Sequence, residues 1–445
     1  MGSEWTRRKV HELQASGSLL VEDGNHGEYR PRPDEFTNNG ASFIRAADMA
    51  DGRVLFKSAE CINDIARARV RKGIGKPGDV LLSHKGTVGK VALVEASCPD
   101  FVCSPQTTFW RVLNDSVIDR SYLFAYLQSH DFKVQLASRK GETDMADYVS
   151  LTAQRQLTIP LPHIEVQRAI GKYSSILADR INLLRETNAT LEAIAQALFK
   201  SWFVDFDPVR AKMEGRAPEG MDEATAALFT DGFEESELGL VPRGWAVSSL
   251  GGVCSYLNRG ISPKYLEEDG VLVLNQKCIR DFSIDYNKGR RHDPVQRKID
   301  GRAITVGDVL VNSTGVGTLG RVAQVLELPE QIVIVDSHVT VVRAGATLSW
   351  PYLGQLMARR QPEIEAMGEG STGQTELSRS KLAEIRVLVP PTDLLECFDQ
   401  IVIPLKKRVA LNEAKTRTLA RLRDTLLPRL ISGQLRLPEA EALIA

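Results

Sequence analysis

Two glycine strings of the form Gly-x-Gly-x-x-Gly are the first candidates for chemistry in this chain. The strings are Gly73/Gly75/Gly78 and Gly315/Gly317/Gly320. Such a string binds a dinucleotide when a strand precedes it and a helix follows it, because the pyrophosphate then meets a helix N-terminus. Both strings instead run into strand-like stretches, at Val80 and at Arg321. They therefore predict tight turns in which glycine supplies positive φ, and they do not predict a nucleotide site.

Other catalytic patterns are missing from the chain. The stretch Gly86–Lys90 resembles a phosphate-binding loop only superficially, because that motif has an earlier glycine and a Ser or Thr after its lysine. There is no Asn/Asp-Pro-Pro-aromatic tetrapeptide, as adenine methyltransferases have, and no H-E-x-x-H, G-x-S-x-G or deaminase zinc signature. The cysteines and histidines are scattered, without a C-x-x-C pair. We therefore predict no catalytic residue, no metal site and no cofactor bound by this chain.

Two loops carry side chains that suit the edges of nucleic-acid bases. Asn and Arg make bidentate contacts with adenine and guanine edges. The candidates for base readout are Asn25, His26, Arg30 and Arg32 in the first loop and Asn258, Arg259 and Lys264 in the second. The same strings are ordinary turn sequences, so a purely structural role stays open for each residue.

Positive charge gathers in two segments although the net charge of the chain is −1. Residues 67–90 hold seven basic residues and one acid, and residues 277–302 hold eight basic residues and four acids, which suits phosphate contacts. The candidate DNA-binding cations are Arg67, Arg69, Arg71, Lys72, Lys85 and Lys90 in the first segment and Lys277, Arg290 and Arg291 in the second. The alternative is that each patch is a solvated face.

Both basic segments lie at the same place in an internal repeat. Gly78–Leu81 returns as Gly307–Leu310, a shift of 229 residues, and Thr190–Leu191 returns as Thr418–Leu419, a shift of 228. Because the offset hardly drifts over this distance, the matches form one diagonal. Each half therefore reads as a mixed globular segment followed by a long helix. Two similar surfaces suit a two-part ligand better than a single active site does.

A leucine-rich helix follows each globular segment. In the first, apolar residues recur every seven residues from Ile170 to Leu198, and a second stripe runs from Ser174 to Trp202, which is the pattern of a coiled-coil seam. This helix is expected from Ile164 to about Phe203, with a length of about 60 Å at about 1.5 Å per residue. We expect Pro208 to close it.

The second helix repeats the stripe, and the two helices are expected to pair. The residues predicted to pair are Leu177, Leu184, Asn188, Leu191 and Leu198 in the first helix and Leu405, Asn412, Leu419 and Leu426 in the second. Antiparallel pairing about the midpoints of the stripes places Asn188 opposite Asn412. Thr392 is a plausible N-cap of the second helix, and Pro404 predicts a kink or a late start.

The globular segments read as short strands and loops with few helices. Strands are expected at 79–83, 90–94 and 107–112, and one helix at 122–136. No apolar run approaches the roughly 18 to 20 residues of a membrane helix, and the polar, basic start predicts no signal peptide. Six scattered cysteines fit a reducing cytoplasm.

The chain resembles the specificity subunit of type I restriction–modification systems over nearly its full length. The strings that carry the resemblance are Gly78–Leu81 with Gly86–Gly89, Ile159–Pro162 with Glu165, Gln167 and Arg168, Ala197–Phe206, Pro242–Trp245, Gly370–Gln374, and Leu426–Pro428 with Ser432–Gly433. One departure is Leu394–Glu396, where the first half has the more typical Val166–Arg168.

The resemblance implies an α+β fold in which two duplicated mixed α/β target-recognition domains are joined by two long antiparallel coiled-coil helices. The implied divisions are a first target-recognition domain at 1–160, a first long helix at 161–207, an acidic connector at 208–240, a second target-recognition domain at 241–391, a second long helix at 392–436 and a loose tail at 437–445.

The resemblance also implies a function and partners. Each domain would read one half of a split sequence in double-stranded DNA, and the helices would act as a ruler and dock two modification (methyltransferase) subunits. Those partners would carry S-adenosylmethionine, and restriction subunits with an ATP/Mg-driven motor would join them, so that the chain itself is not an enzyme. Two alternatives remain: a self-sufficient DNA methyltransferase or nuclease, and a coiled-coil scaffold that does not bind DNA.

Overall fold

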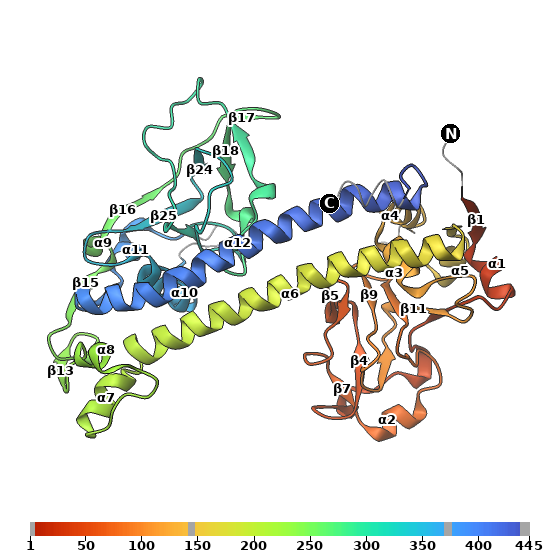
Figure 1. The fold of residues 1–445 in the computed structure, drawn as a ribbon, viewed down its shortest axis with the longest axis horizontal. Coiled ribbons are helices and arrows are strands. Elements are labelled where there is room, and N and C mark those ends of the chain that lie inside the picture. The colour runs from red at the N-terminus through yellow and green to blue at the C-terminus, as the bar shows by residue number, and fades with distance from the viewer. Residues whose placement is uncertain (1–4, 141–146, 369–375, 437–445) are drawn as a thin grey trace. The chain divides into compact units, whose positions relative to one another are not determined.

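The chain forms two compact units, each of which holds one globular segment and parts of both long helices (Figure 1). The computed structural model describes residues 5–140, 147–368 and 376–436. One unit is Met1–Arg185 with Ala414–Ala445, and the other is Glu186–Glu413. The divisions fall inside both long helices, so each unit takes one end of each helix. The string 370–374 and the tail 437–445 lie outside the described residues.

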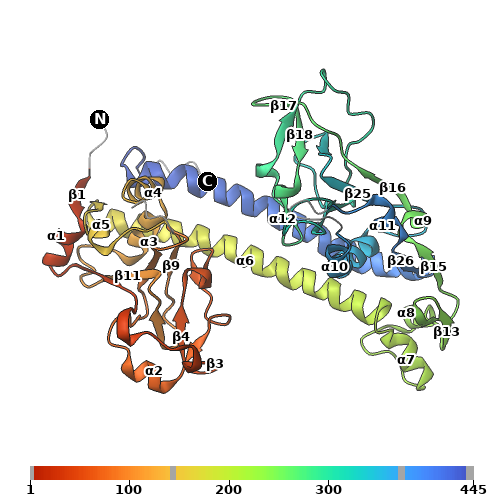
Figure 2. The same cartoon turned by 180° about the vertical axis from the view of Figure 1, so that it is seen from behind.

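The first unit contains two mixed sheets beside its helices. Its elements are β1 (Thr6–Lys9), α1 (Val10–Ala15), β2 (Leu19–Asp23), β3 (Phe36–Thr37), β4 (Ala41–Ile44), β5 (Met49–Ala50), β6 (Arg53–Val54), β7 (Cys61–Ile62), α2 (Asp64–Arg69), β8 (Val80–Ser83), β9 (Val91–Leu93), β10 (Phe101–Cys103), β11 (Thr107–Val112), α3 (Arg120–Gln128), α4 (His130–Ala137), α5 (Leu151–Arg155), β12 (Thr158–Leu161) and the start of α6 (Ile164–Phe203). Six strands are ordered β2-β11-β8-β9-β6-β5, and four are ordered β10-β4-β7-β3. Within this unit α2, β4 and β7 lie farther from α6 than α3 does (Figures 1 and 2).

Both faces of the six-stranded sheet are covered. Along β8, Val80 and Leu82 share a core with α3, whereas Leu81 packs with Phe109 and Phe101 in a second core. This follows from the two-residue period of a strand, which sends successive side chains to opposite faces. A strand that is apolar throughout, such as β8, therefore suits a sheet buried on both sides.

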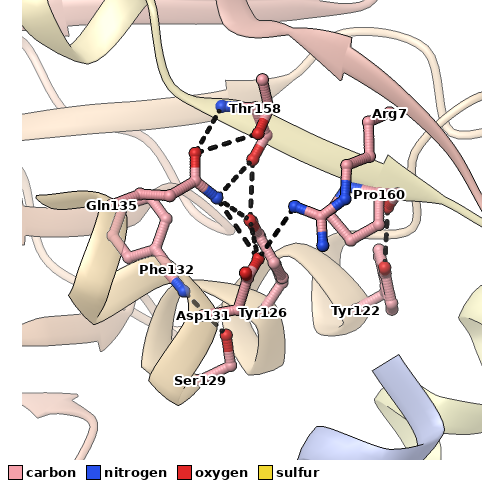
Figure 3. Close-up of polar contacts among 9 residues, drawn as sticks. All are labelled: Arg7, Tyr122, Tyr126, Ser129, Asp131, Phe132, Gln135, Thr158 and Pro160. Atoms are coloured by element: carbon pink, nitrogen blue, oxygen red, sulfur yellow. Dashed lines mark hydrogen bonds and ion pairs between the residues drawn. The ribbon is translucent and has the colours of Figure 1, made fainter. Parts of the chain in front are cut away.

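The helix expected at 122–136 is wrong as a single element, because the chain forms α3 and α4 instead. Ser129 has an extended backbone between them, and its hydroxyl accepts a hydrogen bond from the Phe132 amide at 3.2 Å. A serine in this role caps a new helix. The break lets Tyr126 and Gln135, one from each helix, bond to Thr158 of β12 at 2.7 and 3.0 Å (Figure 3).

The second unit repeats this plan. After the end of α6 it contains α7 (Asp207–Met213), α8 (Glu223–Ala227), β13 (Phe233–Ser236), β14 (Gly239–Pro242), β15 (Ala246–Ser249), α9 (Leu250–Val253), β16 (Cys254–Arg259), β17 (Tyr265–Leu266), β18 (Val271–Leu274), β19 (Ile279–Arg280), β20 (Ser283–Ile284), β21 (Arg290–His292), β22 (Val309–Asn312), β23 (Val322–Gln324), β24 (Val333–Val335), β25 (Val339–Ala344), α10 (Trp350–Ala366), α11 (Arg379–Glu384), β26 (Arg386–Val389) and the start of α12 (Thr392–Ile431). Its two four-stranded sheets are ordered β16-β25-β22-β23 and β17-β21-β18-β24, and the two-stranded sheets are β13-β14, β15-β26 and β19-β20. Figures 1 and 2 show β17 and β18 farther from α12 than α10 is.

The repeated Gly-Asp-Val-Leu string holds a buried ion pair in each unit. The carboxylate of Asp79 is fully buried and accepts two hydrogen bonds from Arg111, at 2.7 and 2.8 Å. In the second unit Asp308 is equally buried and accepts two from Arg343, each at 2.7 Å. A buried carboxylate needs such a partner. The repeat therefore preserves a structural contact in both units.

The segment 208–240 is more than the connector expected from its acidity. Helix α6 ends at Phe203, Phe206 adopts a left-handed backbone at φ 57°, and Pro208 lies in the first turn of α7. Pro208 therefore starts the next helix, where a missing N–H is harmless, and does not close α6. Phe229 packs edge-on against Trp202, with ring centroids 5.3 Å apart, so the segment completes the core of the second unit.

The second long helix differs from expectation at its start. Helix α12 begins at Thr392, while the carbonyl of Pro391 accepts bonds from the amides of Leu394 and Leu395 at 3.2 and 3.1 Å. Thr392 is thus the first helical residue and not the N-cap. The helix runs without interruption through Pro404, so the late start is also wrong. The absent amide of this proline removes only one helical hydrogen bond.

The two long helices pair in antiparallel fashion in the second unit. In the second unit Asn188 is bonded to Asn412, and Glu192 to Lys406, so the partner number falls as the α6 number rises. All nine residues predicted to pair are buried or half-buried, namely Leu177, Leu184, Asn188, Leu191, Leu198, Leu405, Asn412, Leu419 and Leu426.

Each globular core is completed by helix ends from both halves of the chain. Phe199 and Phe203, near the end of α6, pack against Tyr352 and Phe398 of the second unit, with centroids 4.9 to 6.2 Å apart. Leu430, near the end of α12, is buried in the core of the first unit. The aromatic end of the first helix therefore belongs to the second globe.

Candidate nucleic-acid interface

Three loops of the first unit meet at one end of its six-stranded sheet. Strand β11 is antiparallel to both β2 and β8, with Thr108 opposite Asp23 and Thr107 opposite Ser83. The loops after β2 and after β8 therefore lie beside the loop before β11. Loops held by a rigid sheet are a common location for binding residues.

Backbone hydrogen bonds fix these loops to one another. The amide of Gly24 donates to the carbonyl of Thr107 at 2.9 Å, and the amide of His84 donates to the carbonyl of Gln106 at 2.9 Å. The carbonyl of His84 in turn accepts from the amide of Val149 at 2.9 Å. A Cβ at Gly24 would lie 1.8 Å from a backbone oxygen, so only glycine fits at this crossing.

The second unit repeats this backbone frame. Gly260 donates to Val339 at 3.0 Å, Ser313 donates to His338 at 2.8 Å, and Leu377 donates to Ser313 at 2.8 Å. A Cβ at Gly260 would lie 1.9 Å from a backbone oxygen. The equivalent positions in the two units are Asp23 and Arg259, His84 and Ser313, Lys85 and Thr314, Gln106 and His338, and Tyr148 and Glu376. We call these five positions the frame cluster.

In the first unit a buried histidine lies at the centre of the frame cluster. The Nδ1 atom of His84 lies 3.1 Å from the carbonyl of Val149, and Nε2 lies 3.0 Å from a carboxylate oxygen of Asp23. The second pair is close but lacks the orientation of a hydrogen bond. The ring of Tyr148 tilts over His84, with centroids 5.4 Å apart. Lys85 and Gln106 are exposed beside this group.

In the second unit the frame cluster is linked by its own polar contacts. Arg259 forms an ion pair with Glu376 and donates to the carbonyl of Leu377 at 2.7 Å. The hydroxyl of Thr314 lies 2.8 Å from Nδ1 of His338 and 3.3 Å from the side-chain oxygen of Gln276. The same frame thus carries different charges and hydrogen-bonding groups in the two units.

Exposed cations lie next to both clusters. In the second unit the guanidinium of Arg302 donates to the carbonyl of Arg259 at 2.9 Å. In the first unit Gly73 packs closely on Asn25, since a Cβ added at Gly73 would lie 2.6 Å from the backbone nitrogen of Asn25. The exposed Arg71 and Lys72 directly precede Gly73. Cations beside exposed polar side chains suit a nucleic acid, whose phosphates bind cations and whose base edges bind polar groups.

Several sequence candidates lie at this end of the units. His26 and Lys85 are exposed there, as is Lys277, which follows Gln276. Asn25 is not available for direct readout, because it is fully buried and its amide donates to the carbonyl of Tyr29 at 3.0 Å. Its polarity instead shapes the loop.

Three other candidates are held in ion pairs. Arg67 bonds Asp100 at 2.6 Å, and Arg291 bonds Glu330 at 2.7 Å. Arg69 donates to the buried Glu35, and this hydrogen bond, more than any other interaction, lowers the pKa of the Glu35 carboxyl to about 2. These arginines support the fold in the structure, and the sequence could not distinguish them from free cations.

The remaining candidates are divided between internal contacts and open surface. Lys90 donates to the carbonyl of Ala46 at 2.8 Å, and Asn258 accepts from Arg379 at 2.6 Å. The guanidinium of Arg290 lies 3.4 Å from the centre of the Tyr265 ring. The candidates left with exposed side chains are Arg30, Arg32 and Lys264.

Sequence reasoning missed most of the frame cluster. Asp23, Gln106, Tyr148, His338 and Glu376 belong to no motif, and strand pairing brings them together from distant segments. The internal repeat is the signal that could have found these residues. Matching the two halves of the sequence marks equivalent positions that have the same backbone frame but different side chains.

Within residues 5–140, 147–368 and 376–436, no group of three or more His, Cys, Asp or Glu side chains is placed to hold a metal ion. The helices in this described part of the chain are too short or too polar to cross a membrane.

Comparison with known proteins points to one family. Residues 22–193 match the family model described as the type I restriction modification DNA specificity domain. The HindI specificity subunit of a type I restriction enzyme from Haemophilus influenzae is 26% identical in an alignment that covers 88% of this chain and 94% of that protein. The MjaIX specificity subunit from Methanocaldococcus jannaschii is 24% identical over 417 residues, which cover 91% of this chain and 89% of that protein.

The fold is shared with a solved structure. The crystal structure of the S subunit of a type I restriction–modification system from M. genitalium matches with a TM-score of 0.57 and 16% identity, over 96% of each chain. The duplicated α+β architecture is therefore the fold of that subunit.

Proposed function

We propose that this chain, a homologue of the type I restriction enzyme specificity subunits, reads a split sequence in double-stranded DNA with one globular segment for each half-site. The observation that carries the proposal is the repeated backbone frame, which presents different polar side chains in the two units. A target with two different halves calls for such a duplication. Family relationship over nearly the whole chain supports the same conclusion.

The chemistry of the frame cluster suits DNA. Arg71, Lys72 and Arg302 are exposed cations beside the cluster, where they would contact phosphates. Gln, Lys and Glu side chains next to them offer the donors and acceptors that base edges in the major groove recognise.

The long helices would set the gap between the half-sites. Each has 40 residues and thus a length of about 60 Å, more than the roughly 34 Å of one DNA turn. Both pass from one compact unit into the other without a break. They would also dock two modification subunits, which would carry S-adenosylmethionine, and restriction subunits using ATP and Mg would complete a cytoplasmic assembly. This chain would contribute recognition and no catalytic group.

Selection from a random DNA library tests the proposal. The full chain, tagged and purified with the subunits that accompany it, is mixed with random duplexes, and the bound DNA is sequenced. We expect a motif of two short defined parts separated by a fixed undefined gap. Recovery of unselected sequence, or of one continuous motif, would contradict the proposal. The steep salt dependence of affinity that phosphate contacts produce would separate it from a protein scaffold.

The non-catalytic assignment has its own test. The pure chain is incubated with DNA and labelled S-adenosylmethionine, first alone and then with the accompanying subunits. We expect label in DNA only in the second mixture. Label transferred by the chain alone would show that it is a methyltransferase.

A further inference from the structure

The exposed part of the frame cluster differs between the units in a way that packing does not require. The backbone hydrogen bonds around it are the same in both units. Yet a lysine in one unit stands where the other has a threonine, a glutamine where the other has a histidine, and a tyrosine where the other has a glutamate. The residues are Lys85, Gln106 and Tyr148 in the first unit and Thr314, His338 and Glu376 in the second. These six side chains are exposed or half-buried.

We infer that these three positions in each unit select the bases of its half-site. The inference rests on the proposed function and names the side chains that carry it out. A frame that is kept while its side chains change is what two different half-sites need, because the loops are held at the same places and only the hydrogen-bonding pattern differs.

The first unit offers groups that suit purines. The amide of Gln106 has a donor and an acceptor side by side, which matches N6 and N7 of adenine, and the ammonium of Lys85 is a donor for O6 and N7 of guanine. Tyr148 is positioned by the ring of the buried His84. His84 is therefore a positioning residue here.

The second unit offers a different pattern. The carboxylate of Glu376 is an acceptor that suits the N4 amino group of cytosine, and its ion pair with Arg259 holds it in place. The ring of His338 is held through Nδ1 by Thr314 at 2.8 Å, so Nε2 is its remaining polar atom for a base edge. Groups held in this way before binding lose less side-chain freedom on binding.

Exchange of the three residues between the units tests the inference. One variant carries Lys85→Thr, Gln106→His and Tyr148→Glu, and the reciprocal variant carries Thr314→Lys, His338→Gln and Glu376→Tyr. Each full chain is purified with its accompanying subunits and used to select from random duplexes. We expect each exchange to alter the motif of its own half-site and leave the other half-site and the gap unchanged. The unaltered half-site shows that the other unit is folded, and a new defined base preference at the altered half-site shows that the exchanged unit is folded.

Two single variants keep the test independent of the triple exchange. Gln106→Ala and His338→Ala remove exposed side chains, and each should reduce the preference for one base of its own half-site by about tenfold. Lys57→Ala, an exposed position outside the cluster, is the matched control and should keep the wild-type motif.

The outcomes distinguish this inference from the proposed function. If the wild-type chain selects no split motif, the proposed function fails, and this inference falls with it. If the wild type selects a split motif and all cluster variants select the same motif, the proposed function stands and the inference is wrong. A change in both half-sites after one exchange would also overturn it.

Discussion

The side-chain amide of Asn412 donates a hydrogen bond of 2.8 Å to Oδ1 of Asn188, across the seam between α12 and α6. The amide of Asn188 donates in turn to the carbonyl of Val409 at 3.2 Å. Asn412 is 3% exposed. This confirms the pairing expected from the midpoints of the two heptad stripes. A slipped register would bury an amide without a partner, so the pair fixes the register.

Asn188→Leu should therefore destabilise the chain more than the double variant Asn188→Leu/Asn412→Leu does. The single change leaves the Asn412 amide buried and unpaired, which costs about 1 to 3 kcal/mol. The double change replaces both polar groups with apolar ones. Denaturant unfolding of Asn188→Leu, Asn412→Leu, the double variant and the wild type measures this. A double variant whose loss of stability equals the sum of the two single losses would show that the asparagines are not coupled.

The ion pair of Lys406 with Glu192 should respond unequally to removal of either partner. Lys406 is 6% exposed, and its ammonium lies 2.9 and 2.7 Å from the two carboxylate oxygens. Glu192→Gln leaves a buried charge unpaired, whereas Lys406→Met removes that charge and keeps the apolar stem. We expect Glu192→Gln to cost about 1 to 3 kcal/mol and Lys406→Met to cost less. Equal losses of stability in denaturant unfolding would contradict this.

Asp399 on α12 should make stability depend on pH. Burial raises the pKa of its carboxyl from 3.8 to about 6, although Ser349 donates to it at 2.7 Å. Because the folded chain holds this proton more tightly than the unfolded chain, the contribution of Asp399 to stability falls as pH rises from about 4 to about 6. Asp399→Asn should remove that fall. Unfolding midpoints of wild type and variant across this range measure the difference, and parallel curves would refute it.

The basic segment 67–90 should separate into structural and DNA-contacting cations. Arg71→Ala/Lys72→Ala removes exposed charges, so the unfolding temperature should stay unchanged. The slope of log affinity against log salt should become shallower by about one for each phosphate that is no longer bound. The selected motif should persist, since phosphate contacts position without reading bases. Arg69→Ala should instead lower the unfolding temperature, because Glu35 is then left without its partner. An unchanged salt slope in the double variant would make this patch a solvated face.

Lengthening both helices should widen the gap between half-sites. Seven residues inserted after Thr190 in α6 and seven after Ala410 in α12 keep the heptad seam in phase and add about 10 Å, close to three base pairs. Four residues inserted in α6 alone are the control, because they shift the seam out of phase and should destabilise the chain. A selected motif with an unchanged gap after the double insertion would rule out the ruler.

Local patterns were readable from the sequence, and long-range pairings were not. The heptad stripes predicted α6 at Ile164–Phe203, because the seven-residue period of a coiled-coil seam lies within one continuous segment of the sequence. The break at Ser129 was missed because an apolar stripe runs across both α3 and α4, and one capping hydroxyl decides against it. Gln106 and His84 could not be placed together, since only the pairing of β11 with β8 brings them into contact.

The end of α6 lies in the core of the second unit, and the end of α12 lies in the core of the first. This arrangement affects how such a chain can acquire a new specificity. Phe199 and Phe203 are encoded in the first half, but they fill the core of the second globe. A gene crossover that carried one half together with its own helix would therefore bring these rings to a core that had not evolved with them. Crossovers near residue 160, or near residues 241 and 391, would replace one globe and keep the two long helices that evolved together. Recombination should thus favour those junctions when the incoming globe keeps the residues that pack against the helix ends, as Tyr352 does against Phe203.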